Sequence, residues 1–341
     1  MALPENTLGT MFRRDYLPVM PNVWAKKDYA MAAYFFKHME GFQTEKLMVD
    51  VEYQSQSVAT HVGVNDNLAV GDVEFATQGY QDPEMFLDVL RINHKKLMNI
   101  NTKADARKFM TKAMNNVTDG MRENWVKHIL TREASSSQWL RLYDMIYATT
   151  SALHALTPAD FPNSGEGWTP QSINASTYGA VNRAALMNEG EKSYFPSLIR
   201  RLISKCDRWG DTSDMKVYVQ GYHWDLLNDL IDAKKIGSYA KKEDVYLGIE
   251  QIWIGGVAVV KDNWMSYGQT TDKDCIAYLI NHKHIKMRAN RKAMFSLIGN
   301  MIPAQTNTAK VNQIGLYGNF TDDKRNASGF IHTLYGELNY N

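Results

Sequence analysis

The sequence predicts an α+β fold, in which long helices and strands occupy separate stretches of the chain. Apolar residues recur at intervals of three and four over 102–130, which predicts a long amphipathic helix. Two other stretches, 45–80 and 275–335, carry strand signals, with alternating polarity or short runs of β-branched and aromatic residues. Residues 137–270 mix both patterns without the regular alternation of a simple parallel α/β fold.

Length and composition narrow the class of protein. The 341 residues exceed the size at which one core is usual, so two or three substructures are expected. The N-terminus lacks the apolar middle of a signal peptide, and no apolar run could span a bilayer. We therefore expect a cytosol-like compartment, no membrane partner, and reduced core cysteines at Cys206 and Cys275 rather than a disulfide.

The charge balance bears on nucleic-acid binding. The net charge is +1, whereas a dedicated nucleic-acid binder carries a clear basic excess, so any contact with DNA should be local and weak. The basic run 283–292 alternates with apolar residues as a strand would, which places its charges on one face. That face could meet nucleic acid, an acidic partner or only water.

The first 80 residues contain two segments that need a partner. Residues 1–44 hold three prolines and read as an irregular segment that lies on another surface or stays mobile. Residues 45–80 predict a long hairpin, because strands beginning at Leu47 and ending near Phe75 flank a turn-rich tip. A projecting hairpin of this kind is marginally stable alone and usually gains stability from a partner.

The helices follow from periodicity and end signals. Thr102 and Asp105 resemble a capping box for the helix over 102–130, and Gly120 interrupts it. Residues 82–100 are ambiguous between a helix starting at Asp82 and a short extended stretch, whereas residues 139–156 predict a mostly helical segment. Further helices are expected over 195–206, closed by Gly210, and over 222–231.

The strands cluster towards the C-terminal half. A tight hairpin is expected where Gly255-Gly256 separates 252–254 from 257–260. Other strands are expected over 216–219, 275–281, 285–287, 311–320 and 330–334.

No motif in the sequence carries recognisable catalytic or cofactor chemistry. Nucleotide-binding loops, HExxH, CxxC and GxSxG are all missing. His282 and His284 could share one face of a strand, but no third ligand is near and Lys283 and Lys286 would repel a cation. Asp225, Asp229 and Asp232 have helical spacing and predict an exposed helix surface rather than an acid–base pair. We therefore predict no catalytic, cofactor-binding or metal-binding residues, and no enzyme activity.

Four segments resemble the major capsid (coat) proteins of tailed bacteriophages, which have the Hong Kong 97-like fold. They are YLGIEQIWIGGVAVVKDNWM (246–265), CIAYLINHKHIKMRA (275–289), QTNTAKVNQIGLYGNFTDDKRNASGFIHTL (305–334) and the loop ALTPADFPNSGEGWTP (155–170). The order of predicted elements is similar over nearly the whole chain. In the third segment, however, Lys324-Arg325-Asn326 stands where the family usually has Asn before two Arg.

The resemblance implies a division of the chain into four parts. These are an N-terminal arm (1–44), an extended β-hairpin loop (45–81), a peripheral domain with a long spine helix (82–131 and 283–322), and an axial α/β domain (132–282 and 323–341). Some relatives cross-link subunits through a hairpin Lys, but residues 47–94 contain none, so a covalent lattice is not expected.

The resemblance also implies a function and partners. Copies of the chain would assemble into pentamers and hexamers, forming an icosahedral or prolate head that encloses a phage genome. Assembly would occur in the host bacterial cytoplasm, and the product would be part of the virion. Expected partners are a separate scaffolding protein, a portal protein, a possible decoration protein, and double-stranded DNA touched weakly on the inner face.

Three other functions stay open at this point. Encapsulins are compartment shells built from similar subunits that enclose enzymes instead of a genome. An α/β enzyme of another family would need a pocket with converging titratable groups. A third possibility is a tail or head-completion protein, although such proteins usually lack the hairpin and spine helix together.

Overall fold

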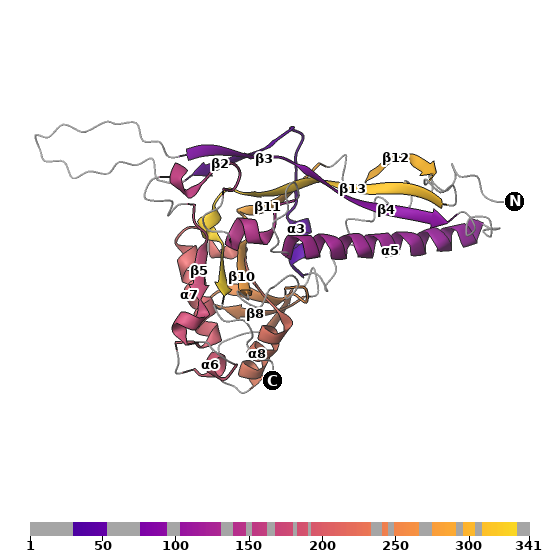
Figure 1. Ribbon diagram of the computed structural model, residues 1–341. Helices are drawn as coiled ribbons and strands as arrows, with labels where there is room; N and C mark the ends of the chain where they lie inside the picture. Colours follow the sequence, from indigo (N-terminus) through magenta and orange to yellow (C-terminus); the bar gives the residue numbers. More distant parts are fainter. Residues whose placement is uncertain are drawn as a thin grey trace, which may run out of the picture.

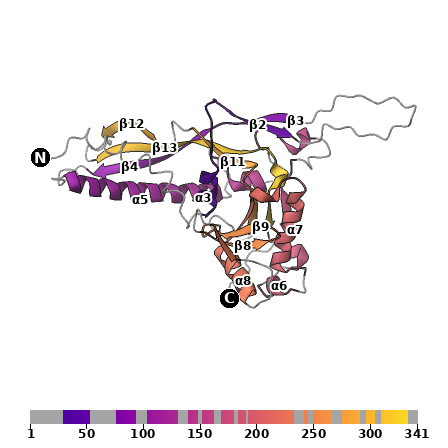
Figure 2. The same cartoon turned by 180° about the vertical axis from the view of Figure 1, so that it is seen from behind.

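The molecule has an elongated upper layer above a more compact lower body (Figures 1 and 2). The computed structural model describes residues 30–52, 76–93, 103–130, 139–147, 152–161, 168–179, 183–189, 192–232, 241–244, 249–265, 275–290, 296–303 and 309–332. No helix among these residues is both long enough and apolar enough to cross a membrane.

The lower body is built on one seven-stranded sheet. Its strands lie in the order β5 (Gln171–Asn174), β14 (Gly329–His332), β10 (Cys275–Asn281), β6 (Met215–Val219), β9 (Val257–Lys261), β8 (Ile249–Ile254) and β7 (Lys241–Asp244). The pairs β14–β5 and β6–β9 are parallel, and the other pairs are antiparallel. The β8–β9 turn has Gly255 and Gly256 at φ of 59° and 82°, which confirms the predicted tight hairpin.

Both faces of this sheet are covered. Val217, Val219 and Leu279 point into a core shared with α7 (Phe195–Asp207) and α8 (Gly221–Asp232). Their neighbours Tyr218 and Ile280 point into a second core shared with the upper layer. Apolar residues on both faces of a strand are typical of a sheet enclosed in a protein interior.

The upper layer has a sheet of five strands over one long helix. β13 (Ala309–Asp322) pairs with β4 (Glu84–Asn93) along one edge and with β12 (Ser296–Pro303) and β11 (Ile285–Ala289) along the other, while β1 (Glu40–Gly41) pairs with β11. Helix α5 (Lys103–Leu130) covers one face of this sheet (Figure 1). Its buried end packs Trp125 against Trp139 and Phe320, which confirms the predicted amphipathic helix.

The base of the predicted hairpin forms a separate two-stranded sheet. β2 (Leu47–Glu52) pairs antiparallel with β3 (Ala76–Gln81). Leu47, Val49 and Val51 alternate as buried residues, as the period of two predicts. The predicted tip lies outside the described residues.

Part of the segment predicted to be irregular is instead a core helix. α3 (Ala30–Lys37) buries every residue from Ala30 to Phe35. The Met31 N–H donates to buried Asp262 at 2.9 Å, and the Tyr34 hydroxyl accepts from Gln251 at 2.6 Å. The short Ala-rich run between polar segments gave too weak a periodic signal to predict this helix.

The helix predicted over 139–156 is wrong. Among the described residues of this stretch, 139–147 and 152–156, the helical element is one π turn at Tyr143–Tyr147. The guanidinium of Arg325 donates to the carbonyls of Asp144 (2.8 Å) and Met145 (2.7 Å), so a side chain distant in sequence occupies acceptors that a continuing α-helix would use. His154 and Ala155 then adopt positive φ, which ends any helix.

Most other predicted elements are confirmed within the described residues, including α7, α8, β6, β10, β11, β13 and β14. The ambiguous stretch after Asp82 is extended, as β4. Strands β5, β7 and β12, the helix α6 (Arg183–Met187) and the 3-10 turns at Pro158–Asp160, Ala175–Tyr178, Thr212–Asp214 and Arg325–Ala327 were not predicted. Each is short or lacks a periodic signal.

Candidate functional site

The two histidines considered as metal ligands are separated by the fold. His282 is buried and its Nε2 lies 2.7 Å from the Tyr218 hydroxyl in a hydrogen bond, whereas the His284 ring pairs with Asp323 at 2.6 Å. Both lie in the turn between β10 and β11 rather than on a strand. Across the described part of the chain, no group of three His, Cys, Asp or Glu side chains could hold a metal ion.

The other polar candidates also have ordinary structural roles. Asp225 and Asp229 are exposed on α8, as predicted, and the side chain of Asp232 lies outside the described residues. Cys206 is buried and free, and burial raises the pKa of its thiol, so it stays protonated as a core residue.

The basic strand β11 has a partner within the chain. Its residues alternate between buried and half-buried, which confirms the predicted strand with one charged face. Lys286 and Arg288 both pair with Glu40 of β1, at 2.6 and 3.5 Å. Glu40 of the same chain therefore pairs with two basic residues of this face.

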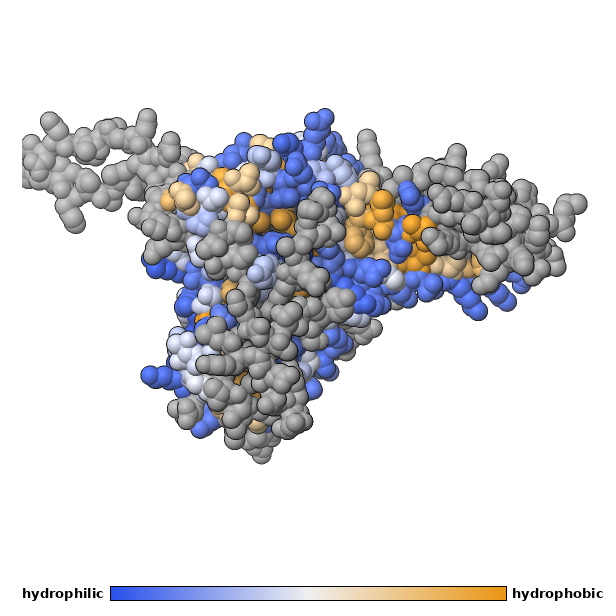
Figure 3. Space-filling view, viewed as in Figure 1, coloured by the Kyte–Doolittle hydropathy of each residue, from blue (hydrophilic) through white to orange (hydrophobic). Residues whose placement is uncertain are grey.

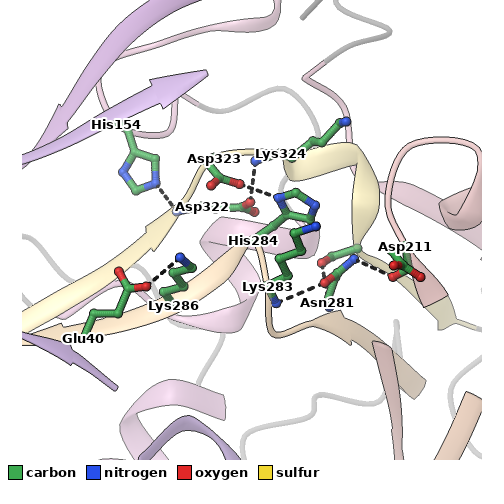
Figure 4. Close-up of polar contacts among 11 residues, drawn as sticks. Glu40, His154, Asp211, Asn281, Lys283, His284, Lys286, Asp322, Asp323 and Lys324 are labelled. Atoms are coloured by element: carbon green, nitrogen blue, oxygen red, sulfur yellow. Dashed lines mark hydrogen bonds and ion pairs between the residues drawn. The ribbon is translucent and has the colours of Figure 1, made fainter. Parts of the chain in front are cut away.

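Buried polar groups concentrate where the chain crosses between the two large sheets (Figure 4). One crossing joins β10 to β11, where Asn281 accepts from the Lys283 N–H and donates to the Asp211 carbonyl. The other joins β13 to β14, where one oxygen of Asp322 accepts from the Lys324 N–H at 3.0 Å. We call this region the junction, and define it by residues 281–284 and 322–326.

Two charged residues of the junction are removed from water. Asp322 and Arg325 are each 0% exposed. Burial raises the pKa of Asp322 to about 7 and lowers the pKa of Arg325 to about 10. A carboxyl group with such a pKa could act as a general acid, but one with no exposed surface cannot touch a substrate. The junction is therefore a structural polar core.

Gly318 and Asn319, which lie in the segment 305–334, hold the upper layer together. A Cβ at Gly318 would lie 2.1 Å from the Arg288 carbonyl oxygen, so only glycine lets β13 approach β11 so closely. Asn319 is fully buried, donates to the Asp82 carbonyl at 2.9 Å and accepts from the Leu140 N–H at 2.8 Å. These contacts give the Gly318-Asn319 pair a packing role.

One surface of the upper layer is unusually apolar. Met85, Leu87 and Val89 alternate along β4 and are 43%, 46% and 36% exposed. The intervening residue Phe86 packs against the core on the α5 side. Figure 3 shows hydrophobic side chains gathered at the surface over β4 and β13, above α5. We call these three residues the β4 stripe.

The remaining exposed large apolar residues lie on the two-stranded sheet. Met48 on β2 is 45% exposed and Tyr80 on β3 is 44% exposed. Within the described ranges, these two residues and the β4 stripe are all of the exposed large apolar residues. A row of exposed apolar residues such as the β4 stripe is typical of a surface that contacts another macromolecule.

Comparisons with solved structures identify the fold. The chain is similar to the cyanophage A-1(L) capsid asymmetric unit, with a TM-score of 0.61, 8% identity and 94% of each chain covered. It is also similar to a structure from Mycobacterium phage Adephagia (TM-score 0.53, 9% identity, 98% of each chain) and to the asymmetric unit of the bacteriophage PhiM1 mature capsid (TM-score 0.51, 12% identity, 86% and 83%).

The chain therefore has the α+β fold of phage capsid proteins, as the resemblance in the sequence implied. No family model and no curated protein sequence matches it. At 8–12% identity, the conserved property is the arrangement of elements and not the residues at particular positions.

Sequence reasoning missed the residues that organise the junction and the β4 stripe. Asp322 and Arg325 carry no sign of burial in the sequence, because charged residues are usually exposed. The β4 stripe did have a signal, since Met85, Leu87 and Val89 alternate with Phe86 and Asp88. The neighbouring Asp82-Pro83-Glu84 helix-start signal obscured it.

Proposed function

We propose that this chain is a major capsid protein that assembles into pentamers and hexamers, forming the head that encloses a phage genome. The similarity to the cyanophage A-1(L) capsid over 94% of both chains is the observation that carries the proposal. A likeness confined to one domain would support only a shared module, whereas this one extends through both large sheets.

The surface of the subunit supports self-association. A closed shell is built from repeated contacts between identical surfaces, so each subunit needs exposed patches that match its copies. The β4 stripe and the residues Met48 and Tyr80 supply apolar area that stays partly exposed in the single chain. Burying apolar area of this kind is the main favourable contribution to association.

Under this proposal the chain divides as the resemblance implies. Residues 1–44 would be the arm, 45–81 the extended loop, 82–131 with 283–322 the peripheral domain, and 132–282 with 323–341 the axial domain. The five-stranded sheet with α5 corresponds to the proposed peripheral domain, and the seven-stranded sheet to the proposed axial domain. Helix α3, with six buried residues, anchors the end of the proposed arm in the core.

The partners follow from the same proposal. A separate scaffolding protein, a portal protein and a possible decoration protein would contact the assembled subunits, and the packaged DNA would touch the inner face weakly. The pairing of Lys286 and Arg288 with Glu40 leaves β11 a poor site for strong DNA binding, which agrees with weak contact. The absence of Lys from residues 47–94 favours non-covalent contacts between subunits.

Sedimentation and negative-stain electron microscopy of the purified chain test the proposal. We expect hexamers, pentamers or closed particles, formed alone or after addition of the scaffolding protein from the same phage. Particles with a tail and DNA from infected cells would separate a phage head from an enzyme-enclosing compartment. A compact monomer or dimer under every condition would contradict the proposal.

A further inference from the structure

The solvent side of helix α7 is basic. The other side of this helix packs its apolar residues into the core of the lower body. At 3.6 residues per turn, four basic residues share the solvent side, and we call them the α7 face: Arg200, Arg201, Lys205 and Arg208. Arg201 is half-buried and the other three are exposed. Asp207 is also exposed on this helix, so the face is not purely basic, but positive charge dominates it.

Two side chains of the α7 face are positioned by neutral groups. Lys205 Nζ donates to the carbonyl of Ser172 at 2.9 Å. The guanidinium of Arg201 lies over the ring of Tyr178, 4.6 Å from its centre. Neither contact is with a carboxylate, so both side chains are held in place and keep their positive charge. The basic strand β11 differs, because Glu40 pairs with two of its basic residues.

Helix α8 has an acidic solvent side. Asp225 and Asp229 are both exposed, and a spacing of four residues makes them neighbours on one side of the helix. We call this pair the α8 face. One basic residue is near, because a Cβ at Gly221 in the first turn would lie 3.4 Å from Lys261 Cε. The two aspartates remain exposed with Lys261 in that position.

The two faces lie towards opposite sides of the lower body. The hydrogen bond from Lys205 to Ser172 places the α7 face beside β5, which is the first strand of the seven-stranded sheet. Helix α8 packs beside β9, nearer the opposite end of that sheet. Figures 1 and 2 show α7 along one side of the lower body and α8 towards the other. Two such faces can match when copies of the chain stand side by side.

We propose that the α7 face of one subunit docks against the α8 face of a neighbouring copy, and that this charge complementarity orients the subunits around a ring. A head-to-tail contact joins two different surfaces, so each subunit offers one surface to each neighbour and the series closes as a ring. Encounters between two α7 faces or between two α8 faces bring like charges together and are disfavoured.

This inference rests on the proposed function, which supplies the neighbouring copy. An acidic protein or a nucleic acid would use the α7 face and leave the α8 face without a role. A second copy explains both faces at once, because each copy carries the charge that the other lacks. The partner of the α7 face is therefore another molecule of this chain.

Two charge reversals in the full-length chain test the docking. One variant carries Lys205→Glu and Arg208→Glu, and the other carries Asp225→Lys and Asp229→Lys. Each variant alone presents like charges at every contact, so its threshold concentration for assembly should rise at least about tenfold. Light scattering measures the threshold at about 0.1 M salt, where charges act over about 10 Å.

Mixing the two variants gives a sharper result. In the mixture, the acidic α7 face of one variant meets the basic α8 face of the other, and the reverse holds at the next contact. The two variants must then alternate, so we expect rings with an even number of subunits, such as hexamers, while five-membered rings are not restored. Native mass spectrometry of the rings gives both the number of subunits and their composition.

The control is a reversal of the same size away from both faces. Lys108 and Lys112 are exposed on α5, and Lys108→Glu with Lys112→Glu should leave the threshold unchanged. An unchanged threshold in the Asp225→Lys, Asp229→Lys variant would overturn the docking, and loss of assembly in the α7 variant alone would point to an acidic or phosphate partner. A mixture that forms no rings would also overturn it. Failure of the unaltered chain to assemble would instead contradict the proposed function.

Discussion

The two large sheets of this protein differ in how they are covered. The lower sheet has apolar residues on both faces, and the chain's own helices and upper layer bury them. The upper sheet has α5 on one face, while the β4 stripe on the other remains exposed. Under the proposed function, stability of the single chain and association between chains would depend on different surfaces, so changes to each should have different effects.

The largest expected effect concerns the hairpin. Deleting residues 55–72 should abolish assembly and leave a soluble, folded chain, because both large sheets are formed by other residues. Sedimentation would detect the loss of particles, and far-UV circular dichroism would report the fold. Unchanged assembly would show that association depends on other surfaces alone.

The second prediction compares how much stability is lost when a leucine is shortened in the covered lower sheet and on the exposed β4 stripe. Leu279→Ala, at a fully buried position of β10, should lower the free energy of unfolding by about 2–5 kcal/mol because it leaves a cavity. The matched change Leu87→Ala, on the β4 stripe, should alter it by about 0.5 kcal/mol or less. Urea unfolding of the unassembled chain measures both, and similar losses would remove the distinction between the sheets.

The third prediction concerns assembly, in which the exposed β4 stripe should have a large effect. Leu87→Ser should raise the protein concentration needed for assembly by about tenfold or more, because the lost apolar burial of one side chain exceeds about 1.4 kcal/mol. Lys108→Ser, an exposed change on α5, is the control and should leave assembly unchanged if the solvent side of α5 is away from the contacts. Light scattering at a series of concentrations gives the threshold, and equal thresholds in both variants would refute the role of the stripe.

The smallest expected effect is a dependence of stability on pH. Burial lowers the pKa values of His154 and His223 to about 3, so the unfolded chain binds two protons that the folded chain does not as pH falls below 6.5. Asp322, whose pKa is raised to about 7, binds one proton in the folded chain and offsets one of the two. These three groups together should contribute a loss of about 1.4 kcal/mol per pH unit between roughly pH 6 and 4. Buried His282, whose pKa is also lowered well below its usual value by burial, adds a loss of the same sign.

A variant isolates the contribution of the junction to that slope. Asp322→Asn keeps the carbonyl that accepts from Lys324 but removes the titrating group, so the loss of stability with acid should become steeper by about 1.4 kcal/mol per pH unit. Thermal unfolding from pH 7 to pH 4 measures the difference. An unchanged slope would mean that Asp322 is ionised in the folded chain throughout this range.

The sequence predicted those parts of the fold whose signal is local. Helix α5 and the β8–β9 hairpin follow from periodicity and from Gly255-Gly256, both of which can be recognised within a short window. The helix expected over 139–156 failed because Arg325 occupies the carbonyls of Asp144 and Met145. No pattern within residues 139–156 shows that the distant Arg325 donates hydrogen bonds to these carbonyls.

The same limit applies to the candidate site. The absence of catalytic motifs pointed towards a structural protein, but the junction and the turn at His154 depend on contacts between segments remote in sequence. His154 accepts from Asp322 and holds Tyr80, and three separate parts of the chain must meet before that role exists. Neither the burial of Asp322 nor the positive φ of Ala155 has a signature in residue type.

The pairing of β4 with β13 has a consequence for the order of events during synthesis. Residues 84–93 find their partner only when residues 309–318 have left the ribosome, and the lower sheet also waits for β14. Contacts between such distant segments form slowly. The β4 stripe is therefore held in its final shape only after residues 309–318 have been made, and under the proposed function shorter chains would not present this surface to a growing assembly.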